Sequence, residues 1–124
     1  MKNFLLSMLL VCGFSIGYAQ QTLVFTNSDL LFKQGRELYD QRKYVASYRS
    51  FESFLNSAEN IQAGQRHEAE YYMVANAYEL RQENAFMLIQ NFLKKHPYTT
   101  FLDEVNSMLG TLLYEEKNYV AALD

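Results

Sequence analysis

Apolar and polar residues along this chain follow the spacing of amphipathic helices. After the polar residues Asn27–Asp29, which are typical of a helix start, apolar side chains recur at steps of three and four. A polar break at Gln41–Lys43 follows, and a second amphipathic stretch runs from Tyr44 to Ala58. Because the break is so short, we expect the two helices to be antiparallel neighbours.

The same pattern predicts a second pair of helices. The polar residues 59–65, which include Gly64, predict a loop, and apolar residues at helical spacing follow it. A polar break at Arg81–Glu83 separates the two helices of this pair, and Pro97 ends the second, because proline cannot continue a helix. Alternation with a period of two does not persist anywhere, so strands are not expected.

A third amphipathic stretch follows Pro97. Thr99-Thr100 is expected to cap it, and Thr100 together with Asp103 resembles a capping box. We expect this helix to end near Glu115–Asn118 and a new helix to begin at Tyr119. The predicted fold class is therefore all-α, with the helices in antiparallel pairs.

An internal repeat supports this pairing. Residues 35–47 read Gly-Arg-Glu-Leu-Tyr-Asp-Gln-Arg-Lys-Tyr-Val-Ala-Ser, and residues 110–122 read Gly-Thr-Leu-Leu-Tyr-Glu-Glu-Lys-Asn-Tyr-Val-Ala-Ala. A glycine inside a helix costs about 1 kcal/mol relative to alanine. Each glycine therefore predicts the close approach of a second helix, Gly35 beside Ser47 and Gly110 beside Ala122.

These residues resemble the tetratricopeptide repeat family, which pairs two helices per repeat around small residues and aromatic residues at fixed positions. The matching residues are Gly35, Tyr39, Tyr44, Ser47 and Phe51, then Ala75, Tyr78, Ala85 and Pro97, then Gly110, Tyr114, Tyr119 and Ala122. The resemblance implies a stacked α-solenoid of two full repeats and a truncated third, with units at residues 28–58, 66–97 and 100–124. Because no capping helix follows the third unit, we expect the natural chain to continue past Asp124.

Residues 1–19 have the form of a secretory signal peptide. Lys2 supplies a positive charge, residues 4–16 form an apolar run, and residues 17–19 place small side chains where a signal peptidase reads them. The run is short for a membrane span, so we expect cleavage after Ala19 rather than an uncleaved anchor. The mature protein is then expected in the periplasm or the cell envelope.

Cys12 lies within this apolar run. A lipoprotein signal has a small residue directly before its modified cysteine, and Val11 stands there instead, so lipid attachment is not expected. Cleavage would leave residues 20–27 as a lead into the first helix. It would also leave no cysteine, and hence no disulfide or thiolate metal site.

The expected mature chain carries a modest negative charge. The chain has 11 Lys and Arg residues, of which Lys2 is in the signal, against 14 Asp and Glu residues, and 10 minus 14 gives a net charge of −4. Charges of both signs are mixed along the chain, with no basic stretch longer than Arg42-Lys43 or Lys94-Lys95. Nucleic acid and anionic membrane surfaces are therefore not expected as partners, nor is a transmembrane segment after signal cleavage.

The family resemblance also implies a binding surface, since stacked repeats of this type place the first helix of each pair on a concave face. Carried onto this chain, it gives candidate groove residues for a peptide or partner protein: Phe32, Arg36, Tyr39, Tyr72, Asn76, Glu79, Thr111, Tyr114 and Glu115. Aromatic side chains with polar neighbours suit an extended peptide or a helix. The alternative is that Phe32 and Tyr72 pack inside the helix stack and the rest form a solvated face.

Patterns typical of catalysis or metal binding are not found in the sequence. His67 has no second histidine four residues later, as a zinc-binding helix requires, so His67 and His96 are interpreted as surface or capping residues. The five glycines are scattered, without a phosphate loop or a Gly-x-Ser-x-Gly elbow. We therefore expect no enzyme activity, no metal and no cofactor.

The function that these features favour is a protein–protein interaction scaffold of the bacterial cell envelope, associated with outer-membrane proteins. Two alternatives remain open. One is an outer-membrane protein that binds a glycan or another ligand, because aromatic faces stack on sugars. The other is the repeat arm of a larger enzyme or sensor.

Overall fold

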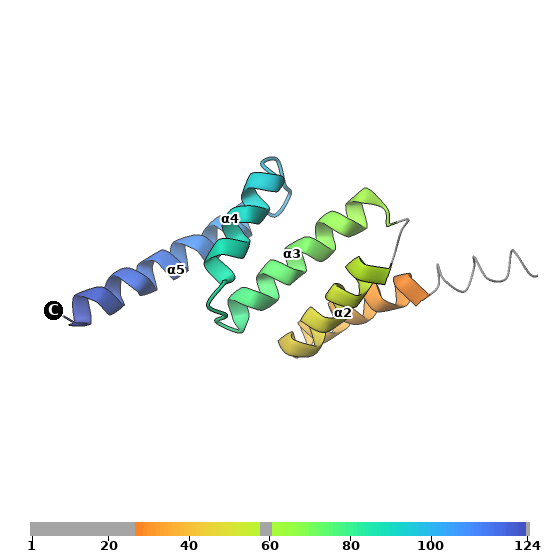
Figure 1. The fold of residues 1–124 in the computed structure, drawn as a ribbon, viewed down its shortest axis with the longest axis horizontal. Coiled ribbons are helices and arrows are strands. Elements are labelled where there is room, and N and C mark those ends of the chain that lie inside the picture. Colours follow the sequence, from red (N-terminus) through yellow and green to blue (C-terminus); the bar gives the residue numbers. More distant parts are fainter. Residues whose placement is uncertain (1–26, 58–60, 124) are drawn as a thin grey trace, which may run out of the picture.

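The computed structural model describes residues 27–57 and 61–123, and every regular element in these ranges is a helix. The helices are residues 27–40, α2 (Tyr44–Ser57), α3 (Ala63–Glu79), α4 (Ala85–Lys95) and α5 (Leu102–Leu123). Each helix from α2 onward packs against the next, so the helices lie in a row in chain order (Figure 1). The predicted all-α fold of adjacent, packed helices is confirmed. The predicted signal peptide and the lead before residue 27 lie outside the described residues.

One tight turn joins the two helices of each pair, at the polar break that the sequence predicts there. Arg42 and Arg81 occupy the left-handed region in these turns, with φ of 57° and 53°. In each turn the next residue donates its N–H to the carbonyl five residues back, at 2.9 and 3.0 Å. This is a Schellman motif, which satisfies carbonyl groups at the helix end and reverses the chain.

The first core cluster joins the helix of residues 27–40 to α2 and α3. Its buried members are Phe32, Phe51, Phe54 and Ala69. Gly35 makes the packing possible, because a Cβ atom built on it would lie only 2.8 Å from the Phe51 ring. The close helix approach predicted at Gly35 is therefore confirmed, and the group that fills the space is the Phe51 ring.

A second core cluster joins α3, α4 and α5. It is built from Val74, Ile89, Phe92 and Val105, each at most 5% exposed. Partly buried side chains of α5, among them Leu109 and Leu112, pack against it. On each of the three helices, the residues in this cluster lie on a single apolar stripe, as the apolar spacing predicts.

The start of α3 differs from the sequence-based prediction. Residues 59–65 were expected to form a loop, but α3 begins at Ala63 and includes Gly64 and Gln65 in its first turn. Gln65 Nε2 donates to Asp29 Oδ1 at 3.2 Å, which ties this turn to the helix of residues 27–40. The early helix start therefore places a polar side chain within reach of the preceding helix pair.

The third helix pair is not formed within the described residues. α5 runs without a break from Leu102 to Leu123, so the turn expected at Glu115–Asn118 and the helix start expected at Tyr119 are wrong. A turn like the first one needs a left-handed residue, as at Arg42, which costs roughly 1–2 kcal/mol. Around Arg42 the packing of α2 offsets this cost, whereas the corresponding face of α5 is exposed and the helix simply continues.

Gly110 also differs from its prediction. A Cβ atom built on it would meet nothing within 4 Å, and Gly110 is exposed. The predicted contact with Ala122 is not formed, because both residues lie on α5, at opposite ends of a span of about 18 Å.

The connection between α4 and α5 uses a different threonine from the one expected. α4 ends at Lys95, next to His96 and Pro97, as predicted. The hydroxyl that accepts a backbone N–H at the start of α5 is that of Thr99, from Phe101 at 3.1 Å. Thr99 is buried, so this bond also fixes the connection against the helix stack.

Replacing Gly35 by alanine tests the close approach. The new methyl group would clash with the buried Phe51 ring, and overpacking of this kind costs about 1–3 kcal/mol. Gly110→Ala is the matched control, because it has free space and is expected to stabilise α5 by about 0.5–1 kcal/mol. Urea unfolding of both variants measures the difference. Equal stability of the two variants would contradict the packing at Gly35.

Candidate partner-binding surface

A buried polar network lies where the helix of residues 27–40, α2 and α3 meet. Asn76 Nδ2 donates to Ser47 Oγ at 2.9 Å and to the Tyr72 carbonyl at 2.8 Å. Ser47 Oγ in turn donates to the Gly35 carbonyl at 2.9 Å. Asn76 and Ser47 are both fully buried, and Asn76 Oδ1 has no partner among the described residues. The network therefore stabilises the fold, and its buried atoms cannot contact a partner protein.

A row of aromatic side chains crosses the surface beside this network. In order the row consists of Tyr44, Tyr39, Tyr72, Tyr71 and Phe101, and neighbouring ring centroids are 5.4, 5.0, 5.3 and 3.9 Å apart. All five side chains are partly exposed. The row extends from the first turn, across α3, to the residue before α5. We call these five residues the aromatic row.

Two carboxylates lie on the helices that carry the row: Glu79 follows Tyr72 by two turns on the same face of α3, and Glu104 is in the first turn of α5, three residues after Phe101. Burial raises the pKa of Tyr39 far above its ordinary value, and the nearby Tyr71 and Glu79 raise it further. Burial likewise raises the pKa of Tyr71, with Glu104 as the next cause. Burial and the neighbouring carboxylates therefore both favour the protonated form of the Tyr39 and Tyr71 hydroxyls.

Two of the nine candidate groove residues are buried. Phe32 is 8% exposed and contacts the Phe51 and Phe54 rings, at centroid distances of 5.8 and 5.1 Å. Asn76 belongs to the buried network. Asn76 must be withdrawn from the candidate surface. Phe32 packs in the core, as the alternative interpretation expects, and its exposed edge lines a surface hollow together with Arg36.

Three other candidates come together around the row. Tyr39 and Tyr72 belong to it, and Glu79 lies on the same face of α3 as Tyr72, two turns further on. Tyr72 also stacks on the Phe51 ring, at 4.9 Å and 3° between planes. It therefore has both a packing role and an accessible edge. Arg36 is exposed, and its Nε lies 3.5 Å from a Glu68 carboxylate oxygen.

The three candidates on α5 are separate from the row. Thr111 is partly buried and donates to the Ser107 carbonyl at 2.9 Å. Glu115 pairs with Arg81 at 3.0 Å, which connects α5 to the turn after α3. Tyr114 is 67% exposed. The structure therefore divides the predicted groove into the row and an α5 surface.

Three members of the row were absent from the candidate residues. Tyr44 is the first residue of α2. Tyr71 lies on the side of α3 that packs against the second core cluster, and Phe101 directly precedes α5. The sequence signal for Tyr71 was its position next to Tyr72, since the side chains of adjacent residues on a helix point about 100° apart and can contact different helices. Which rings they reach depends on the tertiary packing, so the row could not be assembled from spacing alone.

A histidine cluster joins α3 to the end of α4. His67 and His96, expected to be surface or capping residues, have ring centroids 4.7 Å apart. His96 Nε2 lies 2.7 Å from Glu70 Oε2, and Lys95 Nζ donates to Glu70 Oε1 at 2.6 Å. His67 Nε2 lies 2.7 Å from the Thr99 hydroxyl. Both rings are thus contacts between elements, and His96 also ends α4.

Ionisation in this cluster follows from burial and charge. Burial lowers the pKa of His67, and the neighbouring His96 lowers it further, against the opposite influence of Glu70 and Glu68. Burial alone would raise the pKa of Glu70, but the hydrogen bonds from Lys95 and His96 outweigh it, so the pKa lies below its usual value. The cluster is therefore arranged for a neutral His67 and an ionised Glu70.

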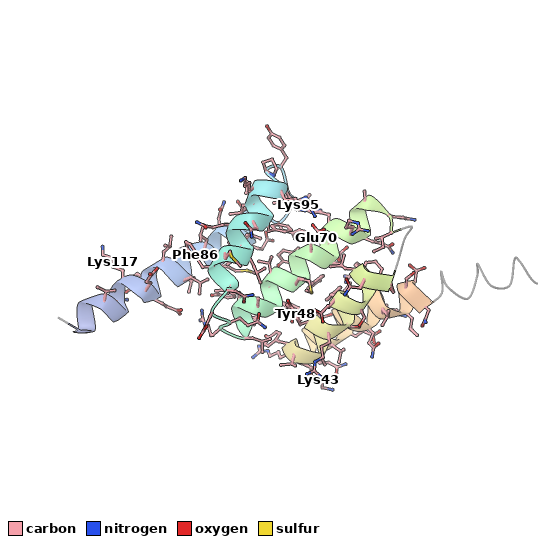
Figure 2. All side chains as sticks on the ribbon, viewed as in Figure 1. Lys43, Tyr48, Glu70, Phe86, Lys95 and Lys117 are labelled. Atoms are coloured by element: carbon pink, nitrogen blue, oxygen red, sulfur yellow. The ribbon has the colours of Figure 1, made fainter. Side chains whose placement is uncertain are left out.

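A hollow of about 270 Å³ lies between α2, α3 and α4, with mainly apolar walls that include Leu55 and Met73. Its lining also includes Tyr48 and the ion pair of Glu70 and Lys95, all three labelled in Figure 2. Because these two charges neutralise each other, the hollow presents an apolar surface.

Within the described residues no group of three or more His, Cys, Asp or Glu side chains is placed to hold a metal ion.

Comparison with protein-family models, with curated proteins and with solved structures finds no match to this chain. The described helices also include none with the length and apolar composition needed to cross a bilayer. Function therefore has to be argued from the surface itself.

The buried network predicts a specific cost for Ser47→Ala. The substitution leaves a buried Asn76 N–H without its acceptor, which costs about 1–3 kcal/mol of unfolding free energy. Ser57→Ala is the control, because this exposed serine bonds only within its own helix and should cost no more than about 0.5 kcal/mol. In an Asn76→Ala background the Ser47→Ala cost should shrink, and strict additivity in urea unfolding would count against the network.

The histidine cluster predicts a loss of stability in acid. Since the folded-state pKa of His67 is depressed, the unfolded chain binds the proton more readily below about pH 6.5. The contribution of neutral His67 is complete above that pH and is lost as the pH falls toward the folded-state pKa. Glu70 adds a loss in the same direction at lower pH. His67→Gln should therefore reduce the fall in Tm between about pH 7.5 and 5.5.

Lys94→Gln, an exposed change in the same region, serves as the control for this pH comparison and should keep the acid sensitivity of the unaltered chain. An identical fall in Tm for His67→Gln and the unaltered chain would show that His67 does not carry the effect.

Proposed function

We propose that this chain is a protein-binding helical stack of the bacterial cell envelope, of the tetratricopeptide type, and that the aromatic row contacts a segment of a partner protein. The proposal combines the repeated sequence pattern with the surface that the helices bring together. The apolar run and small residues of residues 1–19 support export to the envelope.

The aromatic row carries the proposal. Its five partly exposed rings come from three parts of the chain and touch one another in series. Tyrosine is enriched in protein interfaces, because a rigid ring offers a large contact area and its hydroxyl a hydrogen bond at a low cost in conformational entropy. Ring contacts on helices also hold this surface in place before binding, so that the partner bears most of the ordering cost.

The charges beside the row define the partner segment further. Glu79 lies two turns after Tyr72 on the same face of α3, and Glu104 lies in the first turn of α5, three residues after Phe101, so negative charge flanks the row on both helices. A lysine or arginine of the partner could approach a ring face and a carboxylate together, which combines a cation–π interaction with an ion pair. We therefore infer that the bound segment contains a basic residue.

Charge reversal of Glu79 tests this function. The chain of residues 20–124, which contains all the described helices, is used to capture partners from envelope extracts, with identification by mass spectrometry. Glu79→Lys should weaken capture by about tenfold and reduce its salt dependence, because attraction becomes repulsion. Glu83→Lys is the control, an exposed charge reversal in the turn after α3. Equal capture by the two variants would overturn the role of the row.

A glycan is the second candidate ligand, because exposed aromatic rings also stack on sugars. A glycan array with the same chain separates the two. Saturable glycan binding that Tyr39→Ala or Tyr72→Ala removes, without any captured protein, would replace the protein-binding proposal.

A further inference from the structure

One face of α5 is exposed along most of the helix. Its residues follow helical spacing, and all of them are exposed: Asp103, Asn106, Ser107, Gly110, Leu113, Tyr114 and Lys117. The opposite side of the helix, with Val105, Leu109 and Leu112, packs against α4 and α3. We call the exposed stripe the open face of α5. In its C-terminal half, where Lys117 lies, α5 extends beyond the other helices (Figures 1 and 2).

The first helix carries the matching repeat sequence, and its contacts show what kind of segment packs on such a face. Subtracting the repeat offset of 75 places six of the seven open-face residues on residues 28, 31, 32, 35, 38 and 39 of the first helix, all of which are buried or partly buried, and places Lys117 on the exposed Arg42 of the first turn. α2 covers these six residues. Ser47 and Ser50 donate to the Gly35 and Leu31 carbonyls, both at 2.9 Å, and the Phe51 ring fills the space above Gly35.

We propose that the open face of α5 binds an antiparallel helix of a partner protein, one that carries a small residue and, four positions later, an aromatic residue. In α2 these two positions are Ser47 and Phe51. Gly110 is the counterpart of Gly35, and its surroundings are empty to 4 Å, so an aromatic ring can lie directly on the backbone of α5 there. The flanking Leu113 and Tyr114, at 47% and 67% exposed, supply the apolar contact.

The charges at the two ends of the open face select the orientation. Asp103 lies at its N-terminal end and Lys117 at its C-terminal end. An antiparallel partner helix places its C-terminus beside Asp103 and its N-terminus beside Lys117. Helices favour basic residues in their last turn and acidic residues in their first turn, so such a partner matches both charges. A parallel helix would bring like charges together at both ends.

This inference is independent of the aromatic row, because the open face shares no residue with it. Glu79→Lys should leave binding to the open face unchanged, and substitutions at Gly110 should leave capture by the row unchanged. Failure of one proposal therefore does not imply failure of the other.

A synthetic peptide tests the open face. The probe has the sequence of residues 44–57, with two glutamates added at its N-terminus and two lysines at its C-terminus, and fluorescence anisotropy measures its binding to the chain of residues 20–124. We expect saturable binding that Phe51→Ala in the peptide weakens by about tenfold or more, since a buried aromatic anchor is lost. Gly110→Leu in the chain should weaken it to a similar degree by filling the space.

Gly64→Leu is the matched control, since Gly64 is also exposed with free space around it but lies in α3. It should leave the affinity unchanged. Asp103→Lys should weaken binding several-fold, and a peptide ending in two glutamates should restore it. No binding of the original peptide, or binding that Gly110→Leu does not change, would overturn the proposal.

Two further outcomes would assign the face to another occupant and overturn the proposal. One is self-association of the chain in sedimentation equilibrium that Gly110→Leu abolishes, which assigns the face to a second copy. The other is a disulfide between Gly110→Cys and Ala122→Cys in the free chain. That bond requires α5 to fold back on itself and cover its own open face.

Discussion

The contact between Gly35 and the Phe51 ring is the constraint on which the first half of the structure depends. It brings the backbone of the first helix against the side chains of α2 and leaves no room for a Cβ atom. At that distance Ser47 reaches the Gly35 carbonyl and Asn76 reaches Ser47, so three helices are fixed by one close approach. The rings of Phe51 and Tyr72 then stack, and this contact positions the centre of the aromatic row.

The same sequence pattern gives two structures in this chain, and packing explains the difference. Residues 41–43 form a turn, whereas the corresponding residues 116–118 remain helical. The turn requires a left-handed arginine, and burial of α2 offsets the cost. On α5 the corresponding face is exposed, so the local preference of a run rich in leucine, glutamate and lysine for helix decides.

Helices, two of the turns and the core stripes could be predicted because each follows from spacing along the chain. Gly35 could be predicted because a glycine within a helix needs a compensating contact. The helix start at Ala63 could not be predicted, since it depends on a contact between elements, and the continuity of α5 could not, since it depends on the absence of a helix that covers this face. The candidate surface was predicted only in part. Tyr39, Tyr72 and Glu79 were found from their helix positions, but Tyr71 and Phe101 join the row through a stacking contact between distant segments.

Asn76 shows how fold and surface are linked. Its amide donates both hydrogen bonds, and Oδ1 has no partner within residues 27–57 and 61–123, an arrangement less favourable than apolar packing of the same volume. The bond to the Tyr72 carbonyl lies within α3, but the bond to Ser47 crosses to α2 and restricts the rotation of α3 against it. That rotation places Tyr72 on the Phe51 ring and Tyr71 on the Phe101 ring. A polar group in the core thus determines which aromatic edges the surface presents.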